Sequence, residues 1–194
     1  MVEYSIWALA YFVGSIPCGV LVARTQNINV KEHGSGNIGA TNVTRILGKK
    51  AGILTLAGDC LKGYLPVALA NQILGNQIDL AVTGFVAFSG HIFPIFLNFK
   101  GGKGVATGLG VFLSLMPQAT LCAVGIFSLT LIATGYVSAS SIMASIALPL
   151  AGLWLRFPQP FIILAVVVAF IVVQKHHTNI RRLLNGTETK FPQK

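Results

Sequence analysis

Residues 91–107 read HIFPIFLNFKGGKGVAT and lie between two apolar segments. Glycines let the backbone turn sharply and approach a ligand closely, and lysines supply positive charge. The centre of the stretch, Lys100 to Gly104, therefore predicts a turn that binds an anion such as a phosphate. The alternative is an ordinary basic turn between two membrane helices, and this stretch alone does not separate the two.

The composition places the chain in a membrane. Of its 194 residues, 54% are hydrophobic and only 10% are charged, whereas roughly a quarter of the residues of a soluble domain are charged. Such a chain satisfies its backbone polar groups within helices. We therefore predict an all-α, polytopic membrane protein that forms a single domain over residues 1–194.

The net charge of +9 indicates an anionic partner. The basic residues lie between long apolar runs and do not gather on one soluble face, which excludes nucleic acid as the partner. A bilayer surface or an anionic substrate fits better. Cys18, Cys60 and Cys122 stand in apolar stretches, and we interpret them as buried small hydrophobes, with no disulfide or metal role. No cleaved signal peptide is expected, because Glu3 precedes the first apolar run and no basic segment does.

Seven apolar segments are candidates for membrane helices, which need about 17–25 residues. They cover approximately residues 2–23, 51–74, 78–99, 105–116, 119–133, 138–155 and 161–173. The fourth and fifth are short, so the alternative is five helices, with residues 105–133 re-entrant or merged with their neighbours.

The basic residues predict the orientation. With seven helices, 12 of the 14 lysines and arginines fall in loops on one side, and only Arg156 falls in a loop on the other. Cytoplasmic loops carry the excess of basic residues, so the N-terminus should lie outside and the C-terminus inside. Three polar segments, residues 33–50, residues 91–107 and the tail from Lys175, then meet on the cytoplasmic face, where we predict one active site.

The first of these segments reads GSGNIGATNVTR over residues 34–45. Residues 34–39 fit the dinucleotide pattern G-x-G-x-x-G, but no strand precedes them, so a Rossmann site is rejected. The segment remains rich in hydrogen-bond donors, and Arg45 could hold a phosphate through two hydrogen bonds. A glycine-rich loop without a ligand is the alternative. The lysine stretch is not a nucleotide-binding P-loop, because Leu97 and Gly104 stand where that pattern needs glycine and Ser or Thr.

Charged residues elsewhere suggest further parts of a site. Asp59 and Lys62 are three residues apart inside an apolar segment, where they should pair, either as a structural ion pair or at the edge of a site. His176 and His177 are adjacent, and adjacent side chains diverge on a helix, so they should not chelate one metal ion. One of them could face the site as a base, or both could be solvated.

Together these segments resemble the bacterial acyl-phosphate:glycerol-3-phosphate acyltransferase (PlsY) family. The resemblance rests on residues 35–45, 90–107 and 176–183, on residues 59–63, and on the short match from Gly186 to Glu188. It implies transfer of a fatty acyl group from acyl phosphate to the 1-hydroxyl of sn-glycerol 3-phosphate, giving 1-acylglycerol 3-phosphate (lysophosphatidate) and phosphate. This would be the first membrane step of phospholipid synthesis, in the bacterial inner membrane. No cofactor or metal is expected.

The resemblance also implies site residues. As a hypothesis, Arg45 and Lys103 hold glycerol 3-phosphate, and the glycine-loop N–H groups bind acyl phosphate and stabilise the oxyanion. His177 is the first candidate for the general base, with a substrate phosphate oxygen as the alternative. The expected catalytic residues are Ser35, Arg45, Lys103, His177 and Asn179. Expected substrate ligands are Gly36, Asn37, Gly39, Thr41, Asn42, His91, Lys100, Gly101, Gly102, Gly104, Thr107, Arg181 and Glu188, with Asp59 and Lys62 in support.

Two other functions compete with this one. A small transporter of phosphorylated solutes would also need charges within the membrane and broken helices, but its polar residues should lie at the midplane. A structural subunit with a lipid-binding basic face leaves the clustered Asn, Ser and Thr unexplained. The expected partners are the two substrates, membrane lipid and the soluble enzyme that makes acyl phosphate, and the expected state is a monomer.

Overall fold

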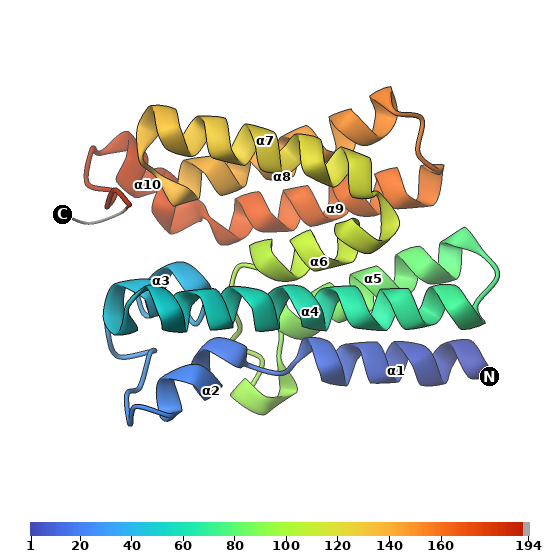
Figure 1. The fold of residues 1–194 in the computed structure, drawn as a ribbon, viewed down its shortest axis with the longest axis horizontal. Helices are drawn as coiled ribbons and strands as arrows, with labels where there is room; N and C mark the ends of the chain where they lie inside the picture. The colour runs from blue at the N-terminus through green and yellow to red at the C-terminus, as the bar shows by residue number, and fades with distance from the viewer. Residues whose placement is uncertain (192–194) are drawn as a thin grey trace. The chain divides into compact units, whose positions relative to one another are not determined.

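Long apolar stretches fold as helices because a bilayer offers no water to backbone N–H and C=O groups. The computed structural model describes residues 1–191, and all regular structure in that range is helical (Figure 1). The all-α prediction is confirmed. The elements are α1 (Val2–Gly14), α2 (Cys18–Arg24), α3 (Ala40–Leu47), α4 (Lys49–Ile73), α5 (Gln77–Ile92), the 3-10 turn η1 (Ile95–Leu97), α6 (Val105–Leu115), α7 (Pro117–Thr134), α8 (Val137–Trp154), α9 (Gln159–Lys175) and α10 (His177–Leu184).

Within residues 1–191, five segments are long and apolar enough to cross a membrane. They are Val2–Arg24, Lys49–Ile73, Gln77–Leu97, Pro117–Thr134 and Val137–Trp154. Helices α9 and α10 make a sixth when taken together, although they meet at a bend of 58°. Helix α6 has 11 residues, about 16 Å, and covers about half of a hydrocarbon core roughly 30 Å thick. Each of the seven predicted segments therefore contains a helix, and five or six are long enough to cross.

Two prolines make the structure differ from the predicted spans. The first span, predicted as one helix, is divided into α1 and α2 by residues 15–17, because Pro17 has no N–H to continue a helix. The third span was expected to reach Phe99, but α5 ends at Ile92. Pro94 disfavours helical backbone at the residue before it, and Phe93 has left the helical region, with φ −129° and ψ 62°.

Two short helices, α3 and α10, lie in segments that the sequence analysis treated as polar loop and tail. Both are only eight residues long, too short for stability by themselves. Helix α3 is held by an apolar cluster beneath the first loop, into which it places Val43. The members of this cluster are Val20, Ala23, Val30, Ile38, Val43 and Ala51. The loop that precedes α3 is thus anchored from below.

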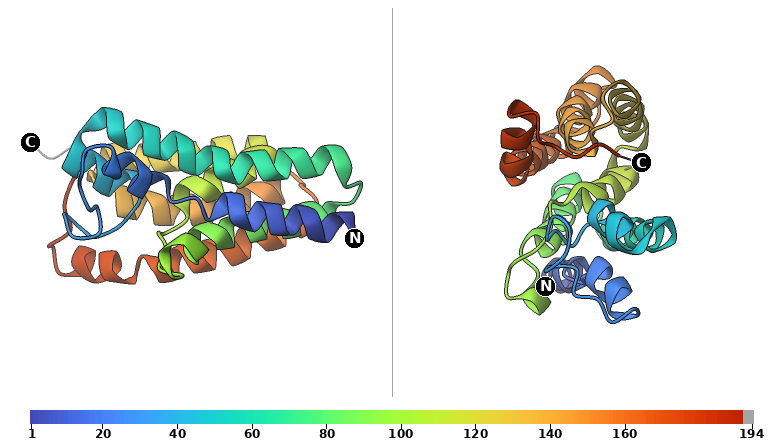
Figure 2. Two further views of the ribbon diagram at one scale, coloured as in Figure 1. Left: turned by 90° about the horizontal axis from the view of Figure 1, so that it is seen from below. Right: turned by 90° about the vertical axis from the view of Figure 1, so that its left-hand side faces the viewer.

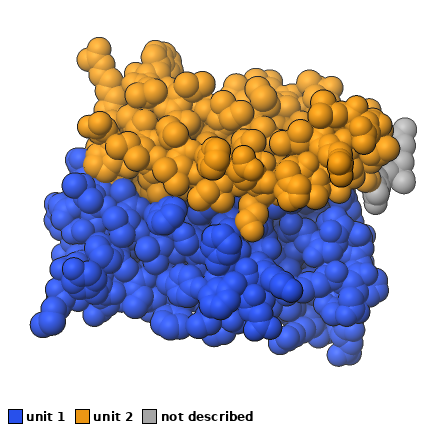
Figure 3. Space-filling model, turned by 180° about the vertical axis from the view of Figure 1, so that it is seen from behind, with its two compact units in different colours: residues 1–114 blue, residues 115–194 orange. Residues whose placement is uncertain are grey.

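Two compact units make up the chain, residues 1–114 and residues 115–194 (Figure 3). In the first unit, α1, α4 and α5 contact one another and run side by side. The short helices α2 and α3 pack on α4, at the end of the unit away from the N-terminus, as both Figure 1 and Figure 2 show. In the second unit α8 packs between α7 and α9, and α10 contacts α8 and α9.

Gly14 allows α1 and α5 to approach closely, and this yields the first prediction. A Cβ at position 14 would overlap the carbonyl group of Ala87 on α5. We expect Gly14→Ala to lower the free energy of unfolding by about 1–3 kcal/mol, because backbone must move to admit the methyl group. Thermal unfolding in detergent measures the change.

The matched control is Gly125→Ala on α7, where a Cβ would meet no atom within 4 Å. Alanine is the better helix former, so this variant should unfold at or above the wild-type temperature. Equal melting of Gly14→Ala and wild type would contradict the close α1–α5 contact.

Candidate active site

Asn42 organises the first glycine-rich loop from the start of α3. Its Oδ1 accepts the backbone N–H of Ser35 at 2.9 Å. Its Nδ2 donates to the carbonyls of Asn37 at 2.8 Å, His33 at 3.2 Å and Val30 at 3.3 Å. The side chain is buried, so its polar atoms serve the loop backbone. Sequence reasoning proposed Asn42 as a substrate ligand, and this geometry makes it the residue that shapes the loop.

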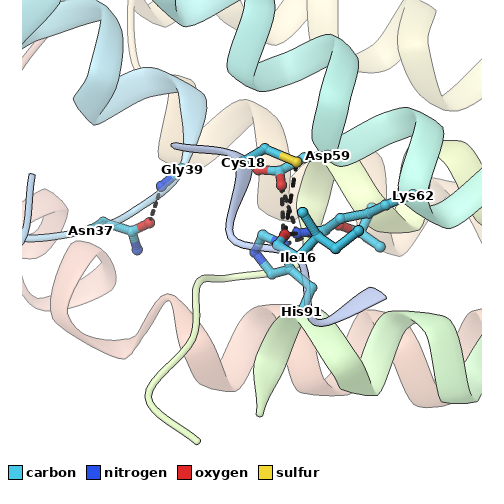
Figure 4. A network of polar contacts seen from close by, with 8 residues as sticks. Ile16, Cys18, Asn37, Gly39, Asp59, Lys62 and His91 are labelled. Atoms are coloured by element: carbon cyan, nitrogen blue, oxygen red, sulfur yellow. Dashed lines mark hydrogen bonds and ion pairs between the residues drawn. The ribbon is translucent and has the colours of Figure 1, made fainter. Parts of the chain in front are cut away.

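The loop leads directly into the N-terminus of α3. The Asn37 side chain accepts the N–H of Gly39 at 2.8 Å, which fixes the last turn before the helix (Figure 4). The first N–H groups of a helix point out of its end and favour an anion there. Thr41 lies in this first turn and Arg45 one turn later, both half-buried, while Ser35 and Gly36 are exposed. The loop therefore presents polar groups next to a helix N-terminus.

The lysine loop folds back on the end of α5. The N–H of Gly102 donates to the carbonyl of His91 at 3.2 Å. A Cβ at Gly102 would overlap the imidazole ring of His91, so only glycine allows this close approach. Lys103 is half-buried and Lys100 is exposed. Gly101 also packs against the end of α5, and Gly104 has a φ of +82°.

The turn before the lysines is apolar and exposed. Its exposed side chains are Phe93, Ile95, Phe96 and Phe99, and Tyr11 Oη on α1 donates to the carbonyl of Phe93 at 2.7 Å. An apolar surface of this kind suits contact with hydrocarbon chains. An apolar, exposed turn therefore borders the lysine loop.

Asp59 and Lys62 form the predicted ion pair, 2.7 Å apart. Both side chains are almost fully buried, and His91 and Cys18 lie beside them (Figure 4). His91 Nδ1 is 3.7 Å from Asp59 Oδ1 and 3.0 Å from Thr107 Oγ1. Four predicted residues therefore meet in one buried cluster.

The two adjacent histidines diverge, as expected. His176 is buried, with its Nδ1 2.7 Å from the carbonyl of Val172. His177 is exposed at the start of α10, with its Nδ1 3.0 Å from the carbonyl of Gln174. Of the pair, only His177 presents its ring to the surroundings.

Glu188 joins the tail to α8 and α10. Its Oε1 accepts Asn179 Nδ2 at 2.7 Å and Ser138 Oγ at 2.8 Å, and its Oε2 accepts Arg182 Nε at 2.6 Å. Burial would raise the pKa of Glu188, but the hydrogen bonds from Arg182, Asn179 and Ser138 outweigh burial and hold the pKa below its ordinary value. The carboxylate is therefore ionised and occupied by protein donors. Arg181, the neighbour of Arg182, is exposed.

Two parts of these clusters were missed by sequence reasoning. Ser138 was taken as part of an apolar span; the only signal was the run Ser138-Ala139-Ser140-Ser141 at the start of α8. The carbonyl of Ile16 accepts Lys62 Nζ at 2.7 Å. The break at Pro17 takes this carbonyl out of the helical hydrogen-bond ladder. Pro17 was the sequence signal for this break, but nothing in the sequence indicated that Lys62 would bind the carbonyl of Ile16.

Comparison with known proteins decides the family. The family model described as glycerol-3-phosphate acyltransferase matches residues 4–186. The chain belongs to the glycerol-3-phosphate acyltransferase family. The resemblance predicted from the three polar segments is confirmed.

Relatives of the same family cover nearly the whole chain. The glycerol-3-phosphate acyltransferase of Geotalea daltonii is 50% identical over 182 residues, which is 94% of each chain. That of Geobacter sulfurreducens is 48% identical over 189 residues, 97% of each chain.

Two solved structures share the fold. Both are crystal structures of PlsY (YgiH), described as an integral membrane glycerol 3-phosphate acyltransferase, at 38% identity. The glycerol 3-phosphate form has a TM-score of 0.95 and the lysophosphatidic acid form 0.93. Each match covers 98% of this chain and 96% of the other. The present chain is accordingly an integral membrane member of the family with several apolar helices.

The Glu188 cluster gives a pH-dependent prediction. Glu188→Gln should lower the thermal stability at pH 7, because hydrogen bonds to a charged group contribute about 1.5–3 kcal/mol each. The folded-state pKa is lowered, so the carboxylate stabilises the fold above its ordinary pKa of 4.5 and loses this effect as the pH falls through the lowered value. The gap between wild type and variant should stay constant from pH 7 to about 5 and shrink below that.

Melting curves from pH 3 to 7 measure the gap. Glu32→Gln, at an exposed carboxylate of the first loop, is the control and should show a much smaller gap. A gap for Glu188→Gln that does not change on acidification would contradict the ionised cluster.

Proposed function

We propose that the protein transfers a fatty acyl group from acyl phosphate to the 1-hydroxyl of sn-glycerol 3-phosphate. The products are 1-acylglycerol 3-phosphate (lysophosphatidate) and phosphate. The proposal places the reaction at the cytoplasmic face of the bacterial inner membrane, in a monomer supplied by the soluble enzyme that makes acyl phosphate. Family membership supports the acceptor, and the solved relative has a glycerol 3-phosphate form and a lysophosphatidic acid form.

One observation carries the proposal on the structural side. Arg45 and Lys103 are half-buried cations on two anchored loops of the first unit, in a chain where charge is scarce. Positive charge held on such loops attracts anions. Both substrates carry a phosphate, so each can supply such an anion. Arg45 can donate two parallel hydrogen bonds to a phosphate, and Lys103 acts as a point charge.

The first loop suits the acyl phosphate. Residues Gly36 to Thr41 lead into α3, whose N-terminal N–H groups favour an anion. In the proposal these N–H groups and Thr41 hold the donor and stabilise the oxyanion that forms on the acyl carbonyl. The exposed Phe93 and Phe99 can keep the fatty chain in an apolar surface while its phosphate reaches the polar loop.

The chemical step is a displacement at the acyl carbonyl. The 1-hydroxyl oxygen of glycerol 3-phosphate attacks the carbonyl carbon and forms the ester bond. The bond between that carbon and the phosphate oxygen breaks, and its electron pair leaves with phosphate. The proton of the hydroxyl passes to a base. Because phosphate is a good leaving group, binding and orientation supply much of the rate.

His177 is the proposed base, and its hydrogen bond supports this role. Its Nδ1 faces the carbonyl of Gln174, and a carbonyl only accepts, so Nδ1 carries the hydrogen. In the neutral ring Nε2 then has the free electron pair. His177 is exposed, so Nε2 can reach a proton outside the helix. A substrate phosphate oxygen is the alternative base.

In the deciding assay, purified protein is incubated with labelled glycerol 3-phosphate and either acyl phosphate or acyl-CoA. We expect labelled lysophosphatidate from acyl phosphate alone, with release of one phosphate per product. Product from acyl-CoA alone would overturn the donor assignment. No product from either donor would refute the acyl transfer and return the transporter to consideration.

Replacing His177 tests the base. If His177 accepts the proton, His177→Ala should lower kcat by about 10²–10⁴-fold, since general base catalysis contributes that much. The control is Thr178→Ala, at the next exposed position of α10, which should retain wild-type kcat. A near-normal rate for His177→Ala would assign the proton to the substrate phosphate.

A further inference from the structure

The buried cluster around Asp59 begins at the interruption between α1 and α2. Residues 15–17 are not helical, so the carbonyl of Ile16 lies outside the regular helical hydrogen-bond ladder. At membrane depth such a carbonyl needs a partner from the protein. Lys62 Nζ donates to it at 2.7 Å and the N–H of Cys18 at 3.1 Å. Lys62 therefore connects α4 to the non-helical residues between α1 and α2.

Asp59 links this break to α5. It lies one turn before Lys62 on α4 and pairs with it at 2.7 Å, while its Oδ1 is 3.7 Å from His91 Nδ1. Figure 4 shows the carboxylate facing both the lysine and the imidazole. A buried lysine without its carboxylate would be an uncompensated charge, so the two residues depend on each other.

His91 links Asp59 to the lysine loop. It is in the last turn of α5, and its Nδ1 lies 3.0 Å from the hydroxyl of Thr107 in the first turn of α6. This contact closes the base of the loop formed by residues 93–104. The carbonyl of His91 accepts the N–H of Gly102, and the His91 ring fills the space where a Cβ of residue 102 would stand. Lys103 is the next residue.

These contacts form a continuous path from the break at Ile16 to the residue before Lys103. Within it, Asp59 is 2% exposed, Lys62 5% and His91 3%. Such small exposed fractions leave no surface for a substrate, so the three side chains can act only through other residues. His91 was also expected to be a substrate ligand, and its burial favours contacts within the protein.

We propose that Asp59, Lys62 and His91 are positioning residues for the acyl transfer. They form a polar brace that fixes the lysine loop, and with it Lys103, relative to α2 and α4. The inference rests on the proposed function, because it takes Lys103 as a ligand of glycerol 3-phosphate. A small displacement of a binding group is enough to weaken a substrate site strongly.

Kinetics with both substrates test the brace. Lys103→Ala, which removes the proposed phosphate ligand, should raise the KM for glycerol 3-phosphate. Asp59→Asn, His91→Ala and the neutral double variant Asp59→Asn/Lys62→Met should each raise the same KM at least about tenfold. The KM for acyl phosphate should stay within about twofold of wild type, since the first loop is held separately by Asn42. If Asp59→Asn alone prevents folding, the double variant, which removes both charges, still allows the measurement.

The matched control is Asp79→Asn, which removes a carboxylate at the start of α5, outside the brace. Its KM values should equal those of the wild type. A purely structural role predicts a different result: less folded enzyme and a lower apparent kcat at unchanged KM. That result for the brace variants would overturn the proposal.

A double-variant cycle tests the contact between His91 and Gly102. Gly102→Ala places its methyl group in the His91 ring, and the three nearest atoms to that methyl all belong to the ring. Gly102→Ala should therefore raise the KM for glycerol 3-phosphate in the wild type but add less than about twofold in the His91→Ala background, because residues in contact are not additive. Full additivity of the two effects would overturn the proposed path.

Hydrogen exchange separates failure of the brace from failure of the function. Peptides that cover residues 98–104 should exchange faster in His91→Ala and Asp59→Asn/Lys62→Met than in Asp79→Asn. If wild-type protein makes no lysophosphatidate but this difference is present, the function is wrong and the brace is right. If wild type is active and the exchange is unchanged, the brace is wrong.

Discussion

At one point in the first unit, a backbone carbonyl that lies outside the helical hydrogen-bond ladder accepts a charged side chain within an apolar segment. Pro17 ends the regular hydrogen bonding of the first membrane segment, and the carbonyl of Ile16 accepts Lys62 Nζ as well as the N–H of Cys18. A buried lysine in turn requires Asp59. From that pair the polar contacts continue to His91 and Thr107. A single break in one helix thus accounts for why charges lie deep in α4.

The loops that carry the candidate ligands are anchored by buried side chains, and their glycines have a steric reason. In the first loop, Asn42 binds four backbone groups and an apolar cluster lies beneath α3. In the lysine loop, Gly102 makes room for the ring of His91. Both loops are therefore preorganised. An enzyme that works mainly by binding and orientation needs ligands whose places are fixed before the substrate arrives.

The sequence predicted the features that depend on composition and short spacing. Apolar runs located the helices, and the three-residue spacing of Asp59 and Lys62 located their ion pair. It also predicted that His176 and His177 diverge, because that follows from helix geometry. The polar segments led to the correct family. These features are local, so neighbouring residues carry the information.

Features that depend on tertiary contacts were not predicted. Helix α3 and helix α10 are too short to be recognised by propensity, since packing stabilises them. The partners of Glu188 lie 6, 9 and 50 residues away along the chain, and no spacing rule joins them. The family resemblance implied Asn42 and His91 as substrate ligands, and this stays a prediction. Their burial, which sequence does not show, gives each of them contacts within the protein.

The position of Glu188 after all three of its partners in the chain has a consequence for synthesis. Ser138, Asn179 and Arg182 all leave the ribosome before the carboxylate that accepts their hydrogen bonds. Until residue 188 emerges, α10 lacks the acceptor that orients Asn179, so the helix that carries His177 cannot reach its final hydrogen-bonded state before that point. The second unit is therefore completed after translation of its helices has ended. A chain that stopped between residues 184 and 188 would contain all the described helices but could not form this polar cluster.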